Sequence, residues 1–413
     1  MSTFSISLSG LKAASDSLSV IGNDLANLNT DGYKNESLNF ASIFNQILGT
    51  SGNGDPIQNG NGVEVAGTST DFANGTVEST GVASNMAIQG NGFFVVENSG
   101  GSLSYTRDGD FTVNSDGQLC TASGQLVMGY TADDGVVQTD SALSPITVNS
   151  VSEIPASATT SFTTTTNLDA TSTTGTSYST SITVYDSLGE SHDLTITYAN
   201  TGTNEWSYNI TMPAADTGGT GDPTVVASGT LDFDSSGVLT SPTGSVAGIS
   251  ITGLADGAAD MDLTWNLNSS AGTPTITQDA STSETSSTTQ NGYASGTLTG
   301  YEVESDGTVE GEYSNDKTLA LGQVAIASFA NNQGLVQTSN NCYTATAASG
   351  AAVIGVAGEG GNGTITGGSV EESNVDLSTE FADMIVAQQG YEANAKALTT
   401  MDQVAQATIQ MIT

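Results

Sequence analysis

The chain contains 413 residues, a length that accommodates roughly two to four domains with sizeable cores. Only 12% of the residues are charged and 49 are glycine, a composition that suits many short strands joined by turns. The 44 acidic and 5 basic residues give a net charge of -39, which argues against nucleic acid and anionic membrane surfaces as partners, because both would repel the chain.

The first predicted element is an amphipathic helix over residues 3–28. Its apolar side chains recur at helical spacing and form one seam: Phe4, Leu8, Leu11, Leu18 and Leu25. The stretch ANLNTDGYK, residues 26–34, is predicted to end this helix. Gly32 can adopt the left-handed conformation common at helix ends, Asn27 and its neighbours can bond the last free backbone groups, and Tyr33 returns the chain to apolar packing.

The interior of the chain is predicted to be β-structure, because runs such as GNGFFVVE and TSITVYDSLGESHDLTITY are bounded by turn signals. Ser/Thr-rich stretches near residues 150–180 and 269–290 mark the crossings into and out of an inserted domain. The predicted fold is mainly β: two β-rich domains, the outer inserted in the inner, with long terminal helices forming a coiled-coil inner domain. The predicted boundaries are 1–65 (amino-terminal helix and linker), 66–149 with 289–365 (discontinuous β domain), 150–288 (inserted outer β domain) and 366–413 (carboxy-terminal helix).

Four interior features that could carry chemistry are interpreted as structural. His192 is predicted to be a turn or strand-edge residue, since no nucleophile elbow and no Cys/His cluster accompanies it. Residues 358–363 match G-x-G-x-x-G but no helix is predicted after them, and residues 232–237 are interpreted as a hairpin turn because the twelfth position of a calcium loop would be Thr243. Cys120 and Cys342 are predicted to be buried free thiols, with a disulfide left open. No catalytic, cofactor-binding or metal-binding residue is predicted.

The last predicted element is a helix over residues 377–411, roughly 50 Å long. Its seam alternates steps near four and three residues, which is coiled-coil spacing, and includes Phe381, Met384, Tyr391, Leu398 and Ile409. A helix with so narrow a seam needs a partner helix, and the amino-terminal helix is the other candidate in the chain. Gly390 inside this helix costs about 1 kcal/mol, so the helix is expected to depend on its neighbours.

Stretches near both ends and in the interior of the chain resemble the bacterial flagellar axial proteins, the family of rod, hook and hook-associated subunits. NDLANLNTDGYK resembles the amino-terminal signature of this family, and TDFANGTVESTGVASNMAIQGNGFFVV followed by YTRDGDFTVNSDGQL resembles its shared β domain. SNVDLSTEFADMIVAQQGYEANAKAL resembles its carboxy-terminal helix, and VYDSLGESHDLTITY is similar to the hook members of the family.

The resemblance implies a structural subunit, not an enzyme, that needs no cofactor and polymerises into a curved helical tube between rod and filament. The seam residues, with Asn27 and Tyr33, would then lie at subunit contacts inside the tube. The implied partners are further copies of the chain, rod and hook-filament junction proteins, the hook cap and the flagellar type III export apparatus. The implied location is the extracellular flagellum, reached without a cleaved signal peptide, since MSTFSISLSG does not fit such a peptide.

Two alternatives remain open from the sequence. Within the family, the chain could be a distal-rod protein, although the rod proteins are shorter and lack the inserted domain. In a different class, it could be an acidic extracellular adhesin, which is expected to carry a secretion signal or an anchor. No run of about 18 apolar residues predicts a membrane-spanning helix.

Overall fold

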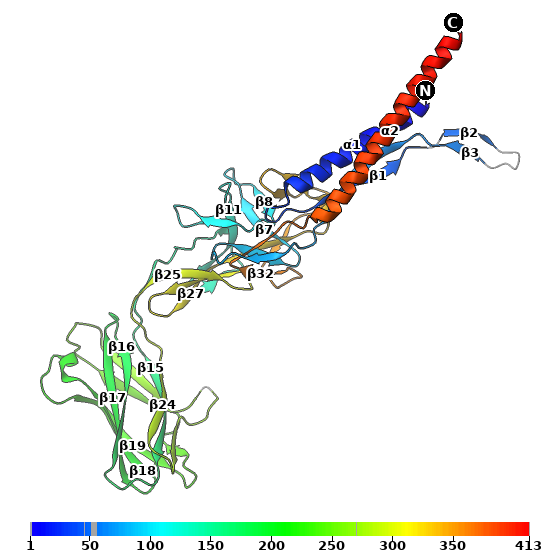
Figure 1. Ribbon diagram of the computed structural model, residues 1–413. Coiled ribbons are helices and arrows are strands. Elements are labelled where there is room, and N and C mark those ends of the chain that lie inside the picture. Colours follow the sequence, from blue (N-terminus) through cyan, green and yellow to red (C-terminus); the bar gives the residue numbers. More distant parts are fainter. Residues whose placement is uncertain (1, 45, 51–55, 270, 413) are drawn as a thin grey trace. The chain divides into compact units, whose positions relative to one another are not determined.

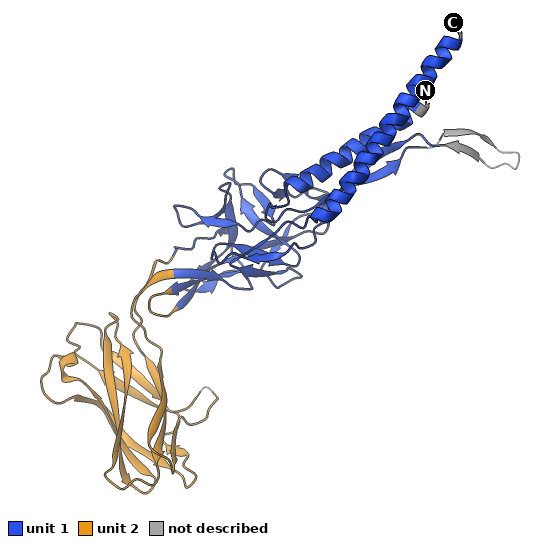
Figure 2. Cartoon of the chain, in the orientation of Figure 1, with its two compact units in different colours: residues 1–150, 300–312, 318–413 blue, residues 151–299, 313–317 orange. Residues whose placement is uncertain are grey.

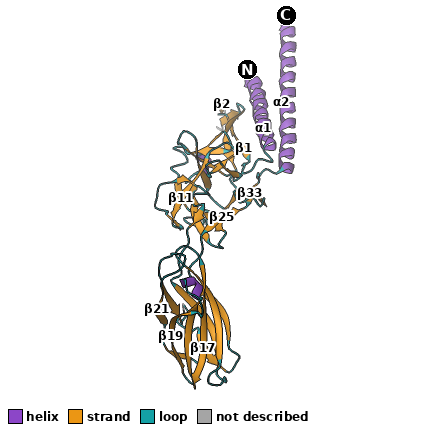
Figure 3. Cartoon of the chain, turned by 90° about the vertical axis from the view of Figure 1, so that its left-hand side faces the viewer, coloured by secondary structure: helices purple, strands orange, loops and turns teal. Residues whose placement is uncertain are grey.

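The computed structural model describes residues 2–44, 46–50, 56–269 and 271–412. The chain is mainly β, with one long helix at each end, as predicted (Figure 3). It divides into two compact units, coloured separately in Figure 2. Unit 1 contains residues 1–150, 300–312 and 318–413, and unit 2 contains residues 151–299 and 313–317.

Unit 1 contains both helices and most of the short strands (Figure 1). Its first segment contains α1 (Ser2–Ala26), β1 (Glu36–Ser42), β2 (Gln46–Thr50), β3 (Pro56–Asn59), β4 (Val63–Thr70), β5 (Val77–Ser79), β6 (Met86–Gln89), β7 (Phe93–Glu97), β8 (Leu103–Thr106), β9 (Phe111–Val113), β10 (Leu119–Thr121), β11 (Leu126–Asp133), β12 (Val136–Val137) and β13 (Ser144–Pro145). Its later segments contain β27 (Thr318–Val324), β28 (Ile326–Ser328), η2 (Asn332–Gly334), β29 (Val336–Thr338), β30 (Cys342–Thr344), β31 (Val353–Gly355), β32 (Thr364–Gly367), β33 (Ser369–Glu371) and α2 (Leu377–Ile412). Two strands have residues in both units: β25 (Gly296–Val303) and β26 (Thr308–Tyr313).

Unit 2 is a β-sandwich of two five-stranded sheets. Its elements are β14 (Glu153–Ile154), β15 (Ser161–Asp169), β16 (Ser177–Tyr185), β17 (Ser191–Gly202), β18 (Glu205–Met212), η1 (Ala214–Thr217), β19 (Thr224–Phe233), β20 (Leu239–Ser241), β21 (Ser245–Ile251), β22 (Met261–Asn266), β23 (Ile276–Asp279) and β24 (Glu284–Gln290). One sheet has the order β16-β17-β18-β19-β20, and the other contains β21, β22, β15 and β23, with β24 paired to β15.

The core of unit 2 forms because its strands alternate buried and exposed side chains. Strand β18, with the sequence EWSYNITM, buries every second residue, which is the period of a strand with one face against a core. Both tryptophans of the chain, Trp206 and Trp265, are fully buried in this core. Tryptophan fluorescence therefore reports the folding of unit 2 specifically.

The segment before α2 pairs with the segment after β4, so the two ends of the chain meet in unit 1. Strand β33 pairs antiparallel with β5, and β32 pairs with β6. Residues 36–70, assigned in part to a linker by the sequence, include the antiparallel pair β1 and β4, which follows α1. The Ser9 hydroxyl accepts a hydrogen bond from the Val63 amide and fixes this strand pair against α1.

Several sequence predictions have a direct outcome in the fold. Cys120 and Cys342 are free and buried, as predicted. Residues 232–237 cover the end of β19 and the turn that leads to its antiparallel partner β20, as predicted for a hairpin. Within the described ranges, neither helix is apolar enough over a sufficient length to cross a membrane.

Candidate subunit-contact surface and its buried base

The two terminal helices pack against each other in antiparallel orientation (Figure 1). Near the start of α1, the Ser7 hydroxyl lies 3.9 Å from the sulfur of Met401, in the last third of α2. A side chain at Gly10 would place its Cβ 2.7 Å from the Asn394 amide oxygen, so the helices approach closely there. The pairing of the helices predicted from the sequence is thus present within one chain.

The face of α2 that packs against α1 differs from the predicted apolar seam. Glu380 is buried, and Ala387, Asn394 and Met401 follow it at seven-residue spacing and are half-buried. Small and polar residues therefore make much of the contact between the helices of one chain. This arrangement leaves much of the apolar seam of α2 outside that contact.

The predicted seam residues fall into three groups. Five have side chains that are 38–63% exposed: Phe4, Leu8, Phe381, Tyr391 and Ile409. Six are half-buried: Leu11, Leu18, Leu25, Asn27, Met384 and Leu398. Tyr33 is buried, with 3% of its surface exposed. The structure therefore places the seam at the edge of the helix pair, with large apolar side chains on both helices open to solvent.

The motif after α1 forms a buried hydrogen-bonded base for the helices. The Tyr33 hydroxyl donates to Asp24 Oδ1 at 2.8 Å and accepts from the Asn23 amide at 2.9 Å. The Asn35 side chain donates to Glu380 Oε1 at 2.6 Å in the first turn of α2. Burial of Tyr33 and its bond to Asp24 raise the pKa of the Tyr33 phenol well above its ordinary value, so the hydroxyl stays a donor. These bonds tie the end of α1 to the start of α2.

Lys34, the residue after Tyr33, belongs to a buried ion cluster with Arg107 and Glu371. Lys34 Nζ is 2.6 Å from Glu371 Oε1, and Arg107 Nη1 is 3.2 Å from Glu371 Oε2. Lys34 and Arg107 also donate to backbone carbonyls, Lys34 to Ala73 at 2.8 Å and Arg107 to Gly90 at 2.6 Å. Burial lowers the pKa of both cations, and the Glu371 carboxylate opposes this shift. The cluster joins the motif after α1, the β-structure and the strand before α2.

Gly32 has a different role from the predicted one. Its φ of +65° is left-handed, but α1 ends at Ala26, and Asn27 donates its side-chain amide to the Asn23 carbonyl there. A Cβ at Gly32 would lie 2.4 Å from the Arg107 carbonyl carbon and the Asp108 nitrogen. Gly32 is therefore needed where the chain passes directly over the Arg107–Asp108 peptide.

Sequence reasoning did not assign Lys34, Arg107 and Glu371 to a site. A signal was present, because the chain has only 5 basic residues and two of them occur in the motifs NLNTDGYK and YTRDGD. A scarce cation within a turn motif is more informative than one on a lysine-rich surface. Their carboxylate partner could not be found in the same way, because it is 1 of 44 acidic residues.

Beside Gly32, Asp108 lies in an acidic group with Asp31 and Asp110. Burial, together with repulsion from these two carboxylates, raises the pKa of Asp108 to about 6. Burial also raises the pKa of Asp31, again with repulsion from Asp110. The junction therefore holds carboxylates that bind protons more readily in the folded protein than in the unfolded chain.

This shift predicts a pH dependence of stability. With a folded pKa above the unfolded value, Asp108 contributes stability that is complete below about pH 4 and lost as the pH rises through about 6. Asp108→Asn keeps the oxygen that accepts the Asp110 amide but cannot ionise. The variant is expected to exceed the parent by on the order of 2 kcal/mol in unfolding free energy at pH 8. Urea unfolding at pH 4 and pH 8 measures this, and an equal pH slope in both proteins would contradict it.

Four family profiles match the chain. They are described as flagella basal body rod protein (residues 4–34), flagellar hook protein FlgE/F/G D1 domain (residues 87–173), flagellar basal body protein FlaE D2 domain (residues 153–293) and flagellar basal body rod FlgEFG protein C-terminal (residues 366–411). The first and last of them cover the helices and the motifs that join them.

Curated relatives match nearly the whole chain. The flagellar hook protein FlgE of Escherichia coli (strain K12) is 35% identical over 416 residues, covering 97% of this chain and 98% of that protein. The flagellar hook protein FlgE of Salmonella typhimurium is 37% identical with the same coverage. The crystal structure of Helicobacter pylori flagellar hook protein FlgE2 has a TM-score of 0.54 at 15% identity, covers 70% of this chain and 98% of its own, and supports the fold alone.

Proposed function

The chain belongs to the flagellar hook protein FlgE family and is a structural subunit of the bacterial flagellar hook, and from this premise we propose that its terminal helices bind further copies of the chain in a tubular polymer. The observation that carries the proposal is the exposed apolar seam. Phe4, Leu8, Phe381 and Tyr391 stay open to solvent although the helices already pack against each other. Apolar side chains grouped in this way mark a surface that binds a partner.

The same surface argues for a repeating coiled-coil contact. The predicted seam of α2 keeps the alternating steps near four and three residues that pack helices side by side. Residues 402–411 of α2 are exposed and include Val404 and Met411. A second copy that covered both the seam and these turns would give each chain a neighbour along the tube wall.

The buried ion cluster attaches the helices rigidly to the β-structure of unit 1. The Lys34–Arg107–Glu371 cluster fixes both helices to the β-structure of unit 1 through partners far apart in the sequence. A tube that bends as it turns needs stiff parts that move as bodies, with the motion confined to the connections between them. We propose that the stiff helix base and the separate sandwich of unit 2 let the hook act as a universal joint between rod and filament. In this arrangement residues 150–288 form the outer domain and the helices line the inside of the tube.

The remaining partners follow from membership in the hook family. We propose that the subunit is exported through the flagellar type III apparatus, assembles under the hook cap outside the cell, and contacts rod and hook-filament junction proteins at the two ends of the hook.

Imaging of a deletion strain tests the proposed place of the chain in the flagellum. Basal structures purified from cells that lack this chain are expected to show a complete rod without a hook, and expression of the intact chain is expected to restore the hook. A missing or shortened rod in the deletion strain would instead assign the chain to the rod. Intact flagella in that strain would contradict the proposal altogether.

A further inference from the structure

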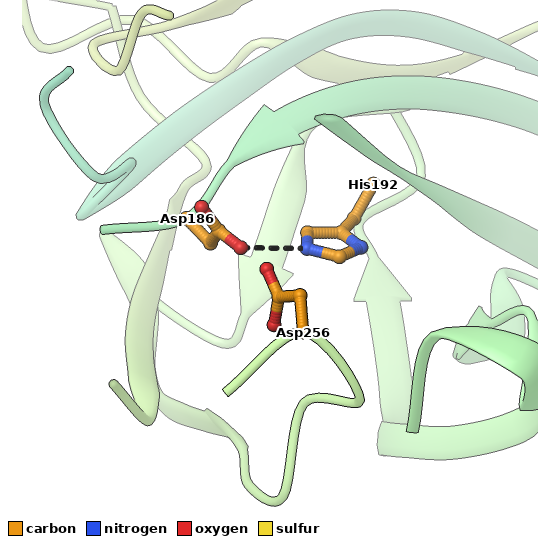
Figure 4. A group of neighbouring side chains, drawn as sticks. All are labelled: Asp186, His192 and Asp256. Atoms are coloured by element: carbon orange, nitrogen blue, oxygen red, sulfur yellow. Dashed lines mark hydrogen bonds and ion pairs between the residues drawn. The ribbon is translucent and has the colours of Figure 1, made fainter. Parts of the chain in front are cut away.

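A histidine and two aspartates converge at one end of the unit 2 sandwich, far in sequence from the helix motifs. Figure 4 shows Asp186, His192 and Asp256 pointing toward one another, and one ligand atom from each lies within 4.8 Å of the others. His192 is the single histidine of the chain and is 4% exposed, while Asp186 is fully buried. An imidazole nitrogen beside two carboxylates is a set of side chains that can bind a cation.

Each ring nitrogen of His192 faces a carboxylate. Nε2 lies 3.2 Å from Asp186 Oδ2, and Nδ1 lies 3.2 Å from Asp216 Oδ2 on the other side of the ring. If Nδ1 carries the proton that it donates to Asp216, the lone pair of Nε2 points at a carboxylate oxygen. That arrangement requires a positive species between Nε2 and Asp186, either a second proton or a metal ion.

The surrounding structure holds these groups in place before any ion binds. Asp186 Oδ1 accepts the Leu188 and Glu190 amides at 2.8 and 3.0 Å, which leaves Oδ2 to face the ring. The Ala255 amide donates to the Asp216 carbonyl at 2.9 Å, and the Ala259 amide donates to the Ser187 hydroxyl at 3.0 Å. The loop that carries Asp256 is thus tied on both sides to the segments that carry the other groups.

We propose that Asp186, His192 and Asp256 bind a divalent cation of intermediate softness, with Zn²⁺ as its representative, and that Asp216 orients the histidine from behind. One imidazole nitrogen and two carboxylate oxygens are ligands that Zn²⁺ accepts at three positions, with water at the fourth. A carboxylate that receives the other ring N–H is the usual support of a metal-binding histidine. The two aspartates would otherwise repel each other, and the cation removes that repulsion.

The ion would join the two sheets of the sandwich. Asp186 follows β16 and His192 is the second residue of β17, so both belong to one sheet. Asp256 lies in the loop between β21 and β22, which belong to the other sheet. Both cysteines of the chain are free, so no disulfide links the two sheets, and the ion would link them instead. This inference is independent of the helix surface proposed above.

Zinc binding by the full chain tests the inference, with tryptophan fluorescence as the readout because Trp206 and Trp265 both lie in unit 2. At pH 7.5, the metal-free parent is expected to bind one Zn²⁺ per chain by calorimetry. Its fluorescence-detected Tm is expected to rise by about 5 °C or more at a hundredfold excess over the dissociation constant. Ca²⁺, which takes six to eight oxygen ligands, is expected to give no comparable shift.

Two variants separate this site from weak binding by the acidic surface. His192→Gln removes the nitrogen ligand, and Asp256→Asn removes an exposed carboxylate whose loss leaves the buried core untouched. Each variant is compared with its own metal-free form, and both are expected to lose the bound ion and the Tm shift. If His192→Gln does not fold, the loss of zinc binding in Asp256→Asn alone tests the site. Absence of a shift in the parent, a full shift in Asp256→Asn, or an equal shift with Ca²⁺ would overturn the proposal.

Discussion

Replacement of Glu371 by glutamine is expected to destabilise unit 1 by about 3–5 kcal/mol, the usual cost of removing one partner from a buried ion pair. Glutamine has nearly the same shape but leaves Lys34 and Arg107 buried without their counter-charge. Burial already lowers the pKa of Lys34, and the carboxylate that opposes this shift would be gone. Thermal unfolding followed by circular dichroism should show the loss.

Glu372→Gln provides the matched control, since the neighbouring side chain is exposed and the change in charge is identical. It is expected to stay within about 0.5 kcal/mol of the parent. Tryptophan fluorescence should report an unchanged unit 2 in both variants, because Trp206 and Trp265 belong to the core of unit 2 and the cluster belongs to unit 1. Equal stability of the Glu371 and Glu372 variants would show that the cluster does not hold the helix base.

Phe381→Asp is expected to give a folded monomer that does not form hooks. Phe381 is 50% exposed in the isolated chain, so a charge there remains solvated until a second copy covers it. Burial of an unpaired charge then costs several kcal/mol at every subunit of the tube. Leu398 is half-buried beside α1, so a charge there would also disturb the helix pair within the chain. A charge at position 381 therefore tests the contact between copies without disturbing the helix pair within one chain.

Two further variants complete this comparison. Phe381→Leu keeps an apolar side chain and is expected to assemble, while Gln389→Asp adds the same charge to α2 at an exposed position outside the seam. Circular dichroism establishes that each monomer folds, and pelleting with electron microscopy measures the polymer. If Phe381→Asp pellets like the parent, the seam is not a contact between subunits. If Gln389→Asp also fails, charge alone explains the loss.

The helices could be predicted because their apolar residues recur at helical spacing over many turns, a signal that exists within one short segment. The face of α2 that packs against α1 could not be predicted, because Ala387 and Asn394 are small or polar and add nothing to the hydrophobic pattern. The close approach at Gly10 likewise depends on a residue far along the chain.

The buried ion cluster illustrates a second limit of sequence reasoning. Charged side chains are almost always exposed, so a fully buried Lys34 contradicts the usual expectation for its residue type. Its partner Glu371 lies 337 residues away, and nothing local to either residue indicates the pairing. His192 shows the same limit, because Asp256 reaches it only when the two sheets of unit 2 pack together.

Thiol labelling at the seam tests most directly the central claim that the exposed helix residues are covered by other copies of the chain. The two native cysteines are buried, so a maleimide reports a single introduced thiol. Phe381→Cys is compared with Val225→Cys, which lies on β19 of unit 2 and is 58% exposed as valine. Both thiols are expected to react in the monomer, and only the thiol at position 381 is expected to be protected in assembled hooks. A thiol at position 381 that reacts as fast in the hook as in the monomer would contradict the account.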